Sequence, residues 1–191
     1  GTNCGLAGQN ACVEVDGAAY WMSENGFFRY AGKLESLPCL VEDHVYDNIN
    51  LESGNQMVSA GLNNLFGEVM WFYPTTGSSV VNKMVCYNYF DSSPQRPVWT
   101  VGTLARTMWE DSAIFGKPHA LEYDAGTDTS FDVVGNTEGR TTYYEHETGT
   151  DQVKGGTVTA ITANISSGDF DITQRIVGNQ MTGIADFRGD G

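Results

Sequence analysis

Short strand-like stretches separated by turn residues recur along this chain, and they constrain its fold more than any other feature. The clearest example joins residues 18–23 (AAYWMS) to residues 27–30 (FFRY). Between them lies Glu24-Asn25-Gly26, which contains the Asn-Gly pair that two-residue hairpin turns favour, because both residues tolerate a positive φ. A second turn follows at residues 31–33. This part of the chain is therefore predicted to form two antiparallel strands joined by a tight turn.

The same pattern continues through most of the 191 residues. Further strands are predicted at residues 68–74, 83–89, 98–102, 118–123, 140–147, 157–163 and 169–176, and residues 181–187 are also strand-like. Many short strands about 8–12 residues apart are typical of sandwiches, barrels and propellers. Glycine and aromatic residues that recur in each hairpin favour the propeller, whose blades repeat every ~40–50 residues. We therefore expect an all-β, β-propeller-like fold in a single β-rich domain spanning residues 1–191.

One segment has helical spacing instead. Val41, Val45 and Ile49 lie four residues apart, and acidic residues occupy the first turn, where the helix dipole favours them. One short helix is therefore expected near residues 41–50, with little helix elsewhere. Residues 55–66 leave two alternatives, a helix with an apolar face or a turn that precedes the next strand.

The charge balance excludes several kinds of partner. Lys and Arg total 10 against 24 Asp and Glu, which gives a formal net charge of −14. A chain this acidic is unsuited to gripping phosphates or to lying on an anionic membrane surface. No run of about 18 apolar residues occurs, so no membrane span is expected.

The four cysteines give no sign of a metal site. Cys4, Cys12, Cys39 and Cys86 form no C-x-x-C pair, and no histidine lies at a zinc-ligand spacing from them. Buried, reduced thiols are the expected state. A disulfide between Cys4 and Cys12 is the alternative.

The most site-like cluster is Glu145-His146-Glu147. In a strand the two glutamates share one face and the histidine lies on the other, so the three side chains cannot converge on one metal ion or substrate. A structural hydrogen-bonding role at a strand end is expected. Asp169 and Asp171 could bind calcium or act in glycoside hydrolysis, but solvated surface carboxylates are the simpler interpretation. Nucleophile elbows and phosphate-binding loops are absent, so no enzyme, catalytic residue, cofactor or metal is predicted.

Aromatic side chains and one arginine are the remaining candidates for a packing or interface role. Four tryptophans lie within strand-like stretches: Trp21, Trp71, Trp99 and Trp109. If exposed, they could stack on sugars or anchor an interface; if buried, they form the core, which is the favoured interpretation. Arg106 is followed closely by two acids, so a buried or interfacial arginine–carboxylate pair is expected there. His146 completes this set of packing or interface positions.

Several of these stretches, taken in order, resemble a module of bacteriophage tail proteins. The matching motifs are YWMS at 20–23, GFFRYAG at 26–32, LPCLV at 37–41, EVMWFYP at 68–74, YNY at 87–89, WTVG at 99–102, RTMWED at 106–111, YEHETG at 144–149 and DFRG at 186–189. The family is the tail nozzle, or tubular hub, of short-tailed phages and their relatives. The motifs extend over nearly the whole chain, and their shared order is more specific than any one of them.

The resemblance implies a structural protein of the virion tail, made in the host cytoplasm. It implies a homo-oligomeric ring, a hexamer in the nozzle family, that contacts the portal or adaptor and other tail proteins and surrounds the channel through which the genome leaves. This chain would then be the propeller-containing portion of a longer tail protein. No catalytic residues carry over from the family. The negative charge independently suits a DNA conduit, because each phosphate that Lys or Arg neutralises adds affinity and would hold the DNA back.

Two other functions stay open at the level of residues. A carbohydrate-binding module that recognises host glycans would use the four Trp and nine Tyr as stacking faces. A glycoside hydrolase would use two of the clustered acids, Asp171 among them.

Overall fold

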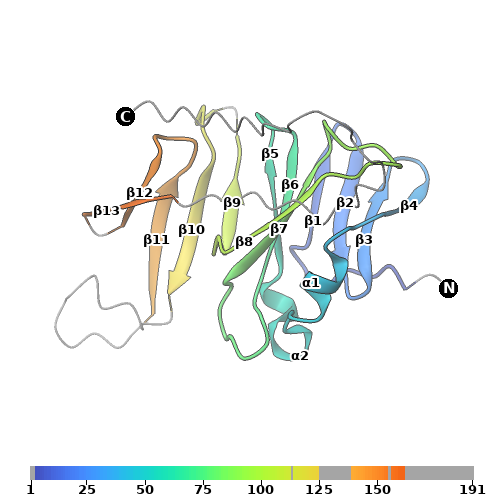
Figure 1. Ribbon diagram of the computed structural model, residues 1–191, viewed down its shortest axis with the longest axis horizontal. Coiled ribbons are helices and arrows are strands. Elements are labelled where there is room, and N and C mark those ends of the chain that lie inside the picture. The colour runs from blue at the N-terminus through green and yellow to red at the C-terminus, as the bar shows by residue number, and fades with distance from the viewer. Residues whose placement is uncertain (1–2, 113, 125–138, 155, 162–191) are drawn as a thin grey trace, which may run out of the picture.

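The computed structural model describes residues 3–112, 114–124, 139–154 and 156–161 (Figure 1). Within these residues the chain is mostly β and forms several antiparallel sheets. The strands predicted at 169–176 and 181–187, and the acids Asp169 and Asp171, lie outside the described residues. No helix in the described part of the chain combines the length and apolar character that crossing a membrane requires.

Sheet 1 is a four-stranded antiparallel meander at the N-terminal side. Its strands follow one another in sequence order: β1 (Cys12–Val15), β2 (Ala18–Ser23), β3 (Gly26–Tyr30) and β4 (Leu34–Leu37). The turn that joins β2 to β3 is formed by Glu24 and Asn25, one residue earlier than the predicted Asn-Gly turn, and Gly26 is the first residue of β3, paired with Ser23. Gly26 has a φ of 134°, which only glycine adopts readily. The hairpin predicted from residues 18–30 is therefore confirmed.

Helical turns connect sheet 1 to the next sheet. They are α1 (Glu42–Tyr46), α2 (Leu51–Gly54) and the 3₁₀ helix η1 (Asn55–Met57). Val45 and Ile49 are both buried in the core, as their spacing predicts, but α1 ends before Ile49. The second helical turn was not predicted, whereas the 3₁₀ helix lies at the start of residues 55–66, for which a helix was one of two alternatives. Only the first residues of the ambiguous stretch 55–66 are helical, and most of the rest is strand and turn.

Sheet 2 repeats the four-stranded meander. Its strands are β5 (Ser59–Asn63), β6 (Glu68–Tyr73), β7 (Lys83–Asn88) and β8 (Trp99–Gly102), again in sequence order. Sheet 3 has three strands, β9 (Met108–Glu110), β10 (His119–Asp124) and β11 (Arg140–Glu145), with β10 in the middle. A separate hairpin follows, formed by β12 (Asp151–Lys154) and β13 (Thr157–Ala160).

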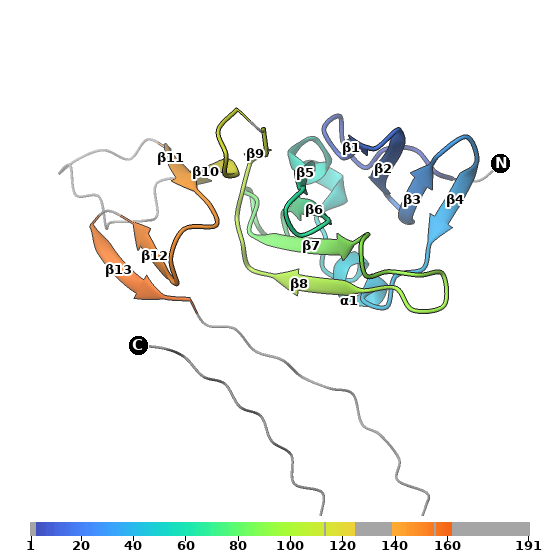
Figure 2. The ribbon, with the colours of Figure 1, turned by 90° about the horizontal axis from the view of Figure 1, so that it is seen from above.

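The first strands of the three sheets lie side by side. β1 contacts β5, and β5 contacts β9. Asn10, two residues before β1, extends this contact, because it forms a parallel bridge with Ser59 and its carbonyl accepts a 2.7 Å hydrogen bond from the Ala60 amide. From this line the sheets fan out in three directions (Figure 2). Each sheet therefore faces the next one, although no closed barrel or propeller is formed within the described residues.

Sheet 2 contributes to two hydrophobic cores, one on each face. Val69, Trp71 and Tyr73 pack in the core shared with sheet 1, whereas Met70 and Phe72 pack in the core shared with Trp109 of sheet 3. Adjacent residues of a strand point to opposite faces, so β6 is buried on both sides. This explains why β6 is continuously apolar rather than alternating.

Candidate functional site

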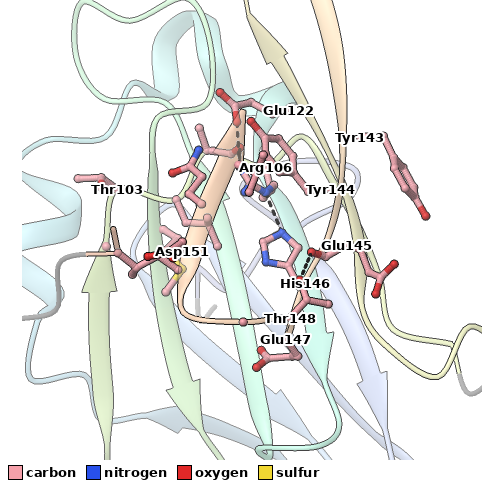
Figure 3. A pocket seen from close by; sticks show the side chains of 18 of the residues that line it. Thr103, Arg106, Glu122, Tyr143, Tyr144, Glu145, His146, Glu147, Thr148 and Asp151 are labelled. Carbon is pink, nitrogen blue, oxygen red and sulfur yellow. Dashed lines mark hydrogen bonds and ion pairs between the residues drawn. The ribbon is translucent and has the colours of Figure 1, made fainter. Parts of the chain in front are cut away.

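An open groove of about 820 Å³ lies beside Arg106 and His146 (Figure 3). Its walls come mainly from three parts of the chain: residues 102–106 at the end of β8 and after it, Glu122 with residues 143–149 in and after sheet 3, and residues 151–153 of the β12–β13 hairpin. The groove brings together Arg106 and His146, two residues that the sequence singled out. The groove is therefore the candidate functional site.

Arg106 is the most constrained charged residue in this groove. Its residue surface is 4% exposed, and its Nη1 donates to Glu122 Oε2 at 2.9 Å and to the Ala105 carbonyl at 2.8 Å. Its Nε donates to His146 Nε2 at 3.0 Å, and the guanidinium lies 4.0 Å from the centre of the Tyr144 ring. The expected arginine–carboxylate pair is present, but its partner is Glu122 on β10 rather than one of the acids that follow Arg106 in sequence.

His146 acts as a hydrogen-bond acceptor in this cluster. Burial lowers its pKa to about 4, and the nearby charges of Arg106 and His119 act in the same direction. Its ring lies 4.5 Å from that of Trp109, measured between centroids. Because Nε2 accepts from Arg106, the ring proton of the neutral imidazole resides on Nδ1. A histidine held neutral in this way is poorly matched to acid–base catalysis near pH 7.

The two glutamates beside His146 diverge from it. Glu145 pairs with Lys117 at 3.5 Å, whereas Glu147 accepts a hydrogen bond from Asn63 Nδ2 at 3.1 Å. Glu147 has a φ of 57°, so the extended strand ends before it. The triplet thus has the structural hydrogen-bonding role at a strand end that was expected. Among the residues that the structure describes, no group of three or more His, Cys, Asp or Glu is placed to hold a metal ion.

The four tryptophans tie separate parts of the chain together. Each indole Nε1 donates to a distant backbone carbonyl: Trp21 to Cys4 at 2.8 Å, Trp71 to Ala11 at 3.0 Å, Trp99 to Pro38 at 2.8 Å and Trp109 to Leu62 at 2.9 Å. The bonds of Trp71 and Trp99 join sheet 2 to the sheet 1 side, and that of Trp109 joins sheet 3 to sheet 2. Trp71 is fully buried and the others are partly buried. All four indoles therefore serve internal packing.

Aromatic stacking reinforces these ties. The Phe27 ring centroid lies 4.9 Å from that of Trp71 and 4.8 Å from that of Trp99, so one aromatic cluster fills the space between sheets 1 and 2. Trp109 stacks on Phe72 at 5.9 Å between sheets 2 and 3. Trp71 and Trp99 therefore lie in the contact between sheets 1 and 2, and Trp109 lies in the contact between sheets 2 and 3. Trp21 lies apart from both on the opposite face of sheet 1, and Arg106 makes its contacts on the sheet 3 side.

Three residues that hold Arg106 or pack against Trp109 were missed at the level of sequence. Glu122 and Tyr144 hold Arg106, and a Cβ built on Gly61 would lie only 2.7 Å from Trp109 Cγ. Gly61 carried a usable signal, because glycine inside a strand often marks a close approach by another group. No local sequence pattern indicated the roles of Glu122 and Tyr144.

All four cysteines are free thiols, as expected, but only Cys86 is buried; Cys4 and Cys39 are partly buried and Cys12 is exposed, so the expectation of buried thiols was wrong for Cys12. Burial raises the pKa of Cys86 to about 12 and that of Cys39 to about 11. The thiolate is the reactive form, so these two side chains are poor nucleophiles at neutral pH.

Comparisons with known proteins add no identification. No protein-family model matches the sequence, and a search of curated proteins found no match. The function is therefore inferred from the residues and their arrangement.

Proposed function

We propose that this chain is a structural component of a bacteriophage tail, a portion of a nozzle or hub ring that forms the wall of the DNA-ejection channel and docks other tail proteins. The observation that carries the proposal is the arrangement of the sheets. Three successive antiparallel meanders place their first strands side by side and fan outward, which is how consecutive blades of a propeller are arranged (Figure 2).

Three of the motifs that resemble the nozzle family lie at contacts between sheets. The tryptophans of EVMWFYP and WTVG pack on Phe27 between sheets 1 and 2, and Trp109 of RTMWED packs on Phe72 between sheets 2 and 3. RTMWED and YEHETG also meet on the sheet 3 side through Arg106 and His146. A resemblance concentrated in packing residues supports a shared architecture rather than a shared reaction. It suits a protein whose function depends on its shape.

Electrostatics supports the same proposal. A net charge of −14 on each chain opposes the approach of duplex DNA, and at physiological salt that repulsion extends over ~8 Å. The buried Arg106 already pairs with Glu122, so it is not presented to phosphates. DNA would pass such a wall without being held.

The carbohydrate-binding alternative is less well supported. A sugar-stacking site needs an accessible aromatic face. Trp71 is fully buried, Trp99 stacks on it at 6.1 Å, and Trp109 is packed between Phe72 and His146. The aromatic residues that motivated the alternative are therefore largely committed to the fold.

Electron microscopy of phage particles tests the proposal. An antibody raised against this chain should label the tails of particles produced from the genome that encodes it, and the purified full-length protein should form rings. Labelling elsewhere, or a full-length protein that stays monomeric, would contradict the proposal. Two binding assays at about 0.15 M salt complete the test. DNA should not be retarded in a gel, and a glycan array should be blank; specific glycan binding would favour the alternative.

A further inference from the structure

The His146 ring contacts both the buried arginine of the groove and the tryptophan that joins sheet 3 to sheet 2. Its Nε2 accepts a 3.0 Å hydrogen bond from Arg106 Nε (Figure 3), and its ring centroid lies 4.5 Å from that of Trp109. Trp109 in turn stacks on Phe72 of β6 at 5.9 Å and donates to the Leu62 carbonyl of β5 at 2.9 Å. The ring therefore supports an aromatic contact between the two sheets.

The residue after His146 provides a second tie to sheet 2. Glu147 accepts a 3.1 Å hydrogen bond from the Nδ2 atom of Asn63, the last residue of β5. The backbone N–H of His146 donates to the Pro118 carbonyl at 2.8 Å, which holds the same stretch against the start of β10. Because residues 146 and 147 are adjacent, a displacement of the first moves the second away from Asn63.

A proton on the His146 ring is incompatible with this position. The protonated imidazole carries a hydrogen on both nitrogens, so Nε2 would turn an N–H toward the Nε–H of Arg106. Two donors and two positive charges would then meet at a hydrogen-bond distance, and the charge of His119 on β10 acts in the same direction.

The carboxylates near the ring are largely engaged with other residues. The titratable groups on the surrounding elements are His119 and Glu122 on β10, Tyr144 and Glu145 on β11, Glu147 after β11, Glu68 on β6 and Asp151 on β12. Glu122 pairs with Arg106 at 2.9 Å, and Glu145 pairs with Lys117 at 3.5 Å. The charge in direct contact with the ring is that of Arg106, so a protonated imidazole meets repulsion there.

Sheet 3 is the least deeply buried of the three sheets. Within the described residues the largest fully buried side chains come from sheets 1 and 2 and the segments that connect them, among them Phe27 and Trp71, and sheet 3 contributes none. Segments with few buried apolar contacts open at a lower free energy than the core. A small sheet is also stable only while its hydrophobic face is packed. Sheet 3 can therefore open while the rest of the chain stays folded.

We propose that His146 is an acid-sensitive latch: uptake of a proton drives its ring away from Arg106 and Trp109, and sheet 3 then unfolds locally while sheets 1 and 2 stay packed. Opening exposes the ring to water, where its pKa takes the ordinary value of about 6.5, whereas burial lowers the pKa to about 4 in the closed state. The open state should therefore gain about 10–30-fold in population, relative to the closed state, from pH 7.5 to pH 5. This inference is independent of the proposed role in a phage tail.

Hydrogen exchange of the full chain, followed by mass spectrometry at pH 7.5 and pH 5, tests the latch. Peptides from β10 should exchange faster than peptides from β6 at both pH values, because sheet 3 opens without the core. Each exchange rate is divided by that of His146→Gln at the same pH, which cancels the pH dependence of the exchange chemistry. For β10 this ratio should rise about 10–30-fold from pH 7.5 to pH 5. The matched control, His44→Gln, removes an exposed histidine on α1 and should keep the full rise.

Three results would overturn the proposal. Equal exchange rates of β10 and β6 peptides would show that sheet 3 opens only when the whole chain unfolds. A ratio that does not change with pH would show that His146 does not control the opening, and loss of the rise in His44→Gln would assign the effect to another histidine. Protection of β6 at pH 7.5 shows that a variant is folded; if His146→Gln is not, His146→Asn, which also lacks a titrating ring, replaces it.

Discussion

Acidification should destabilise this protein through His146 between pH 6.5 and pH 4. In the folded chain the His146 pKa is lowered to about 4, whereas in the unfolded chain it takes its ordinary value of about 6.5. Above pH 6.5 the imidazole is neutral in both states and has no effect on the pH dependence. As the pH falls below 6.5, the unfolded chain gains a proton that the folded chain cannot accept, so stability is lost until about pH 4.

The size of this loss follows from the pKa difference. A tenfold difference in proton affinity corresponds to ~1.4 kcal/mol, so lowering the pH from 7.5 to 5 should cost roughly 2 kcal/mol, reduced somewhat by the partial exposure of the ring. Measurements at pH 5 also stay above the sequence pI of about 4.3, where the chain keeps its solubilising charge.

Urea unfolding followed by tryptophan fluorescence measures the effect, with His146→Gln as the matched variant. The glutamine amide oxygen can still accept the hydrogen bond from Arg106 Nε, but it does not titrate. The free energy of unfolding of the parent minus that of the variant should fall by about 1–2 kcal/mol from pH 7.5 to pH 5.

The difference between parent and variant cancels the contribution that the other titrating groups make to the pH dependence, because both proteins contain them. Among them is Glu68, whose pKa is raised by burial and by Glu147. A carboxyl with a raised pKa acts in the opposite direction, because it favours the folded state as the pH falls. A difference between parent and variant that does not change with pH would refute the burial of His146 against Arg106.

Two further predictions concern the contacts between sheets. Gly61→Ala should lower the free energy of unfolding by about 1–3 kcal/mol, because its Cβ would meet Trp109 at 2.7 Å, whereas Gly5→Ala, with nothing within 4 Å, should change it by less than about 0.5 kcal/mol. Equal effects in the two urea titrations would argue against the close packing of sheet 3 on sheet 2. Trp71→Phe should lower the free energy of unfolding by about 2–4 kcal/mol in the same assay, because it leaves a cavity in the core and the Ala11 carbonyl without its indole donor. A decrease below about 0.5 kcal/mol would show that this bond does not join the sheets.

The strands with strong local signals could be predicted from the sequence. β2, β3, β6 and β7 are rich in aromatic or β-branched residues and are bounded by turns, so propensity and turn chemistry agree about them. The strands that were not predicted are β1, β4, β5 and β12. They are short and less apolar, and they are strands chiefly because a stronger neighbour pairs with them.

β5 shows why such strands escape a local analysis. It contains Gly61 and Asn63, two residues that usually weaken a strand. Its place in the fold comes from long-range contacts: β6 pairs along its whole length, Trp109 covers Gly61, and Glu147 accepts a hydrogen bond from Asn63. These partners are remote in sequence, so no window around β5 reveals them.

The site shows a similar division between residue types and partners. The sequence identified Arg106 and His146 and predicted a structural role for the second. It could not identify Glu122 or Tyr144 as the partners of Arg106, because that pairing depends on how β10 and β11 align. The candidate residues could be predicted because their chemistry depends on residue type. Their hydrogen-bond partners could not, because those depend on strand register.

The burial of β6 on both faces makes the two cores mechanically dependent on each other. Trp71 belongs to the core with sheet 1, and its neighbours Met70 and Phe72 belong to the core with sheet 3. A displacement of β6 toward one sheet therefore loosens its packing against the other, because close-packed interiors transmit strain. Sheets 1, 2 and 3 are consequently expected to resist bending together as one body. The proposed channel wall would need such resistance, which would come from the tryptophan contacts between sheets.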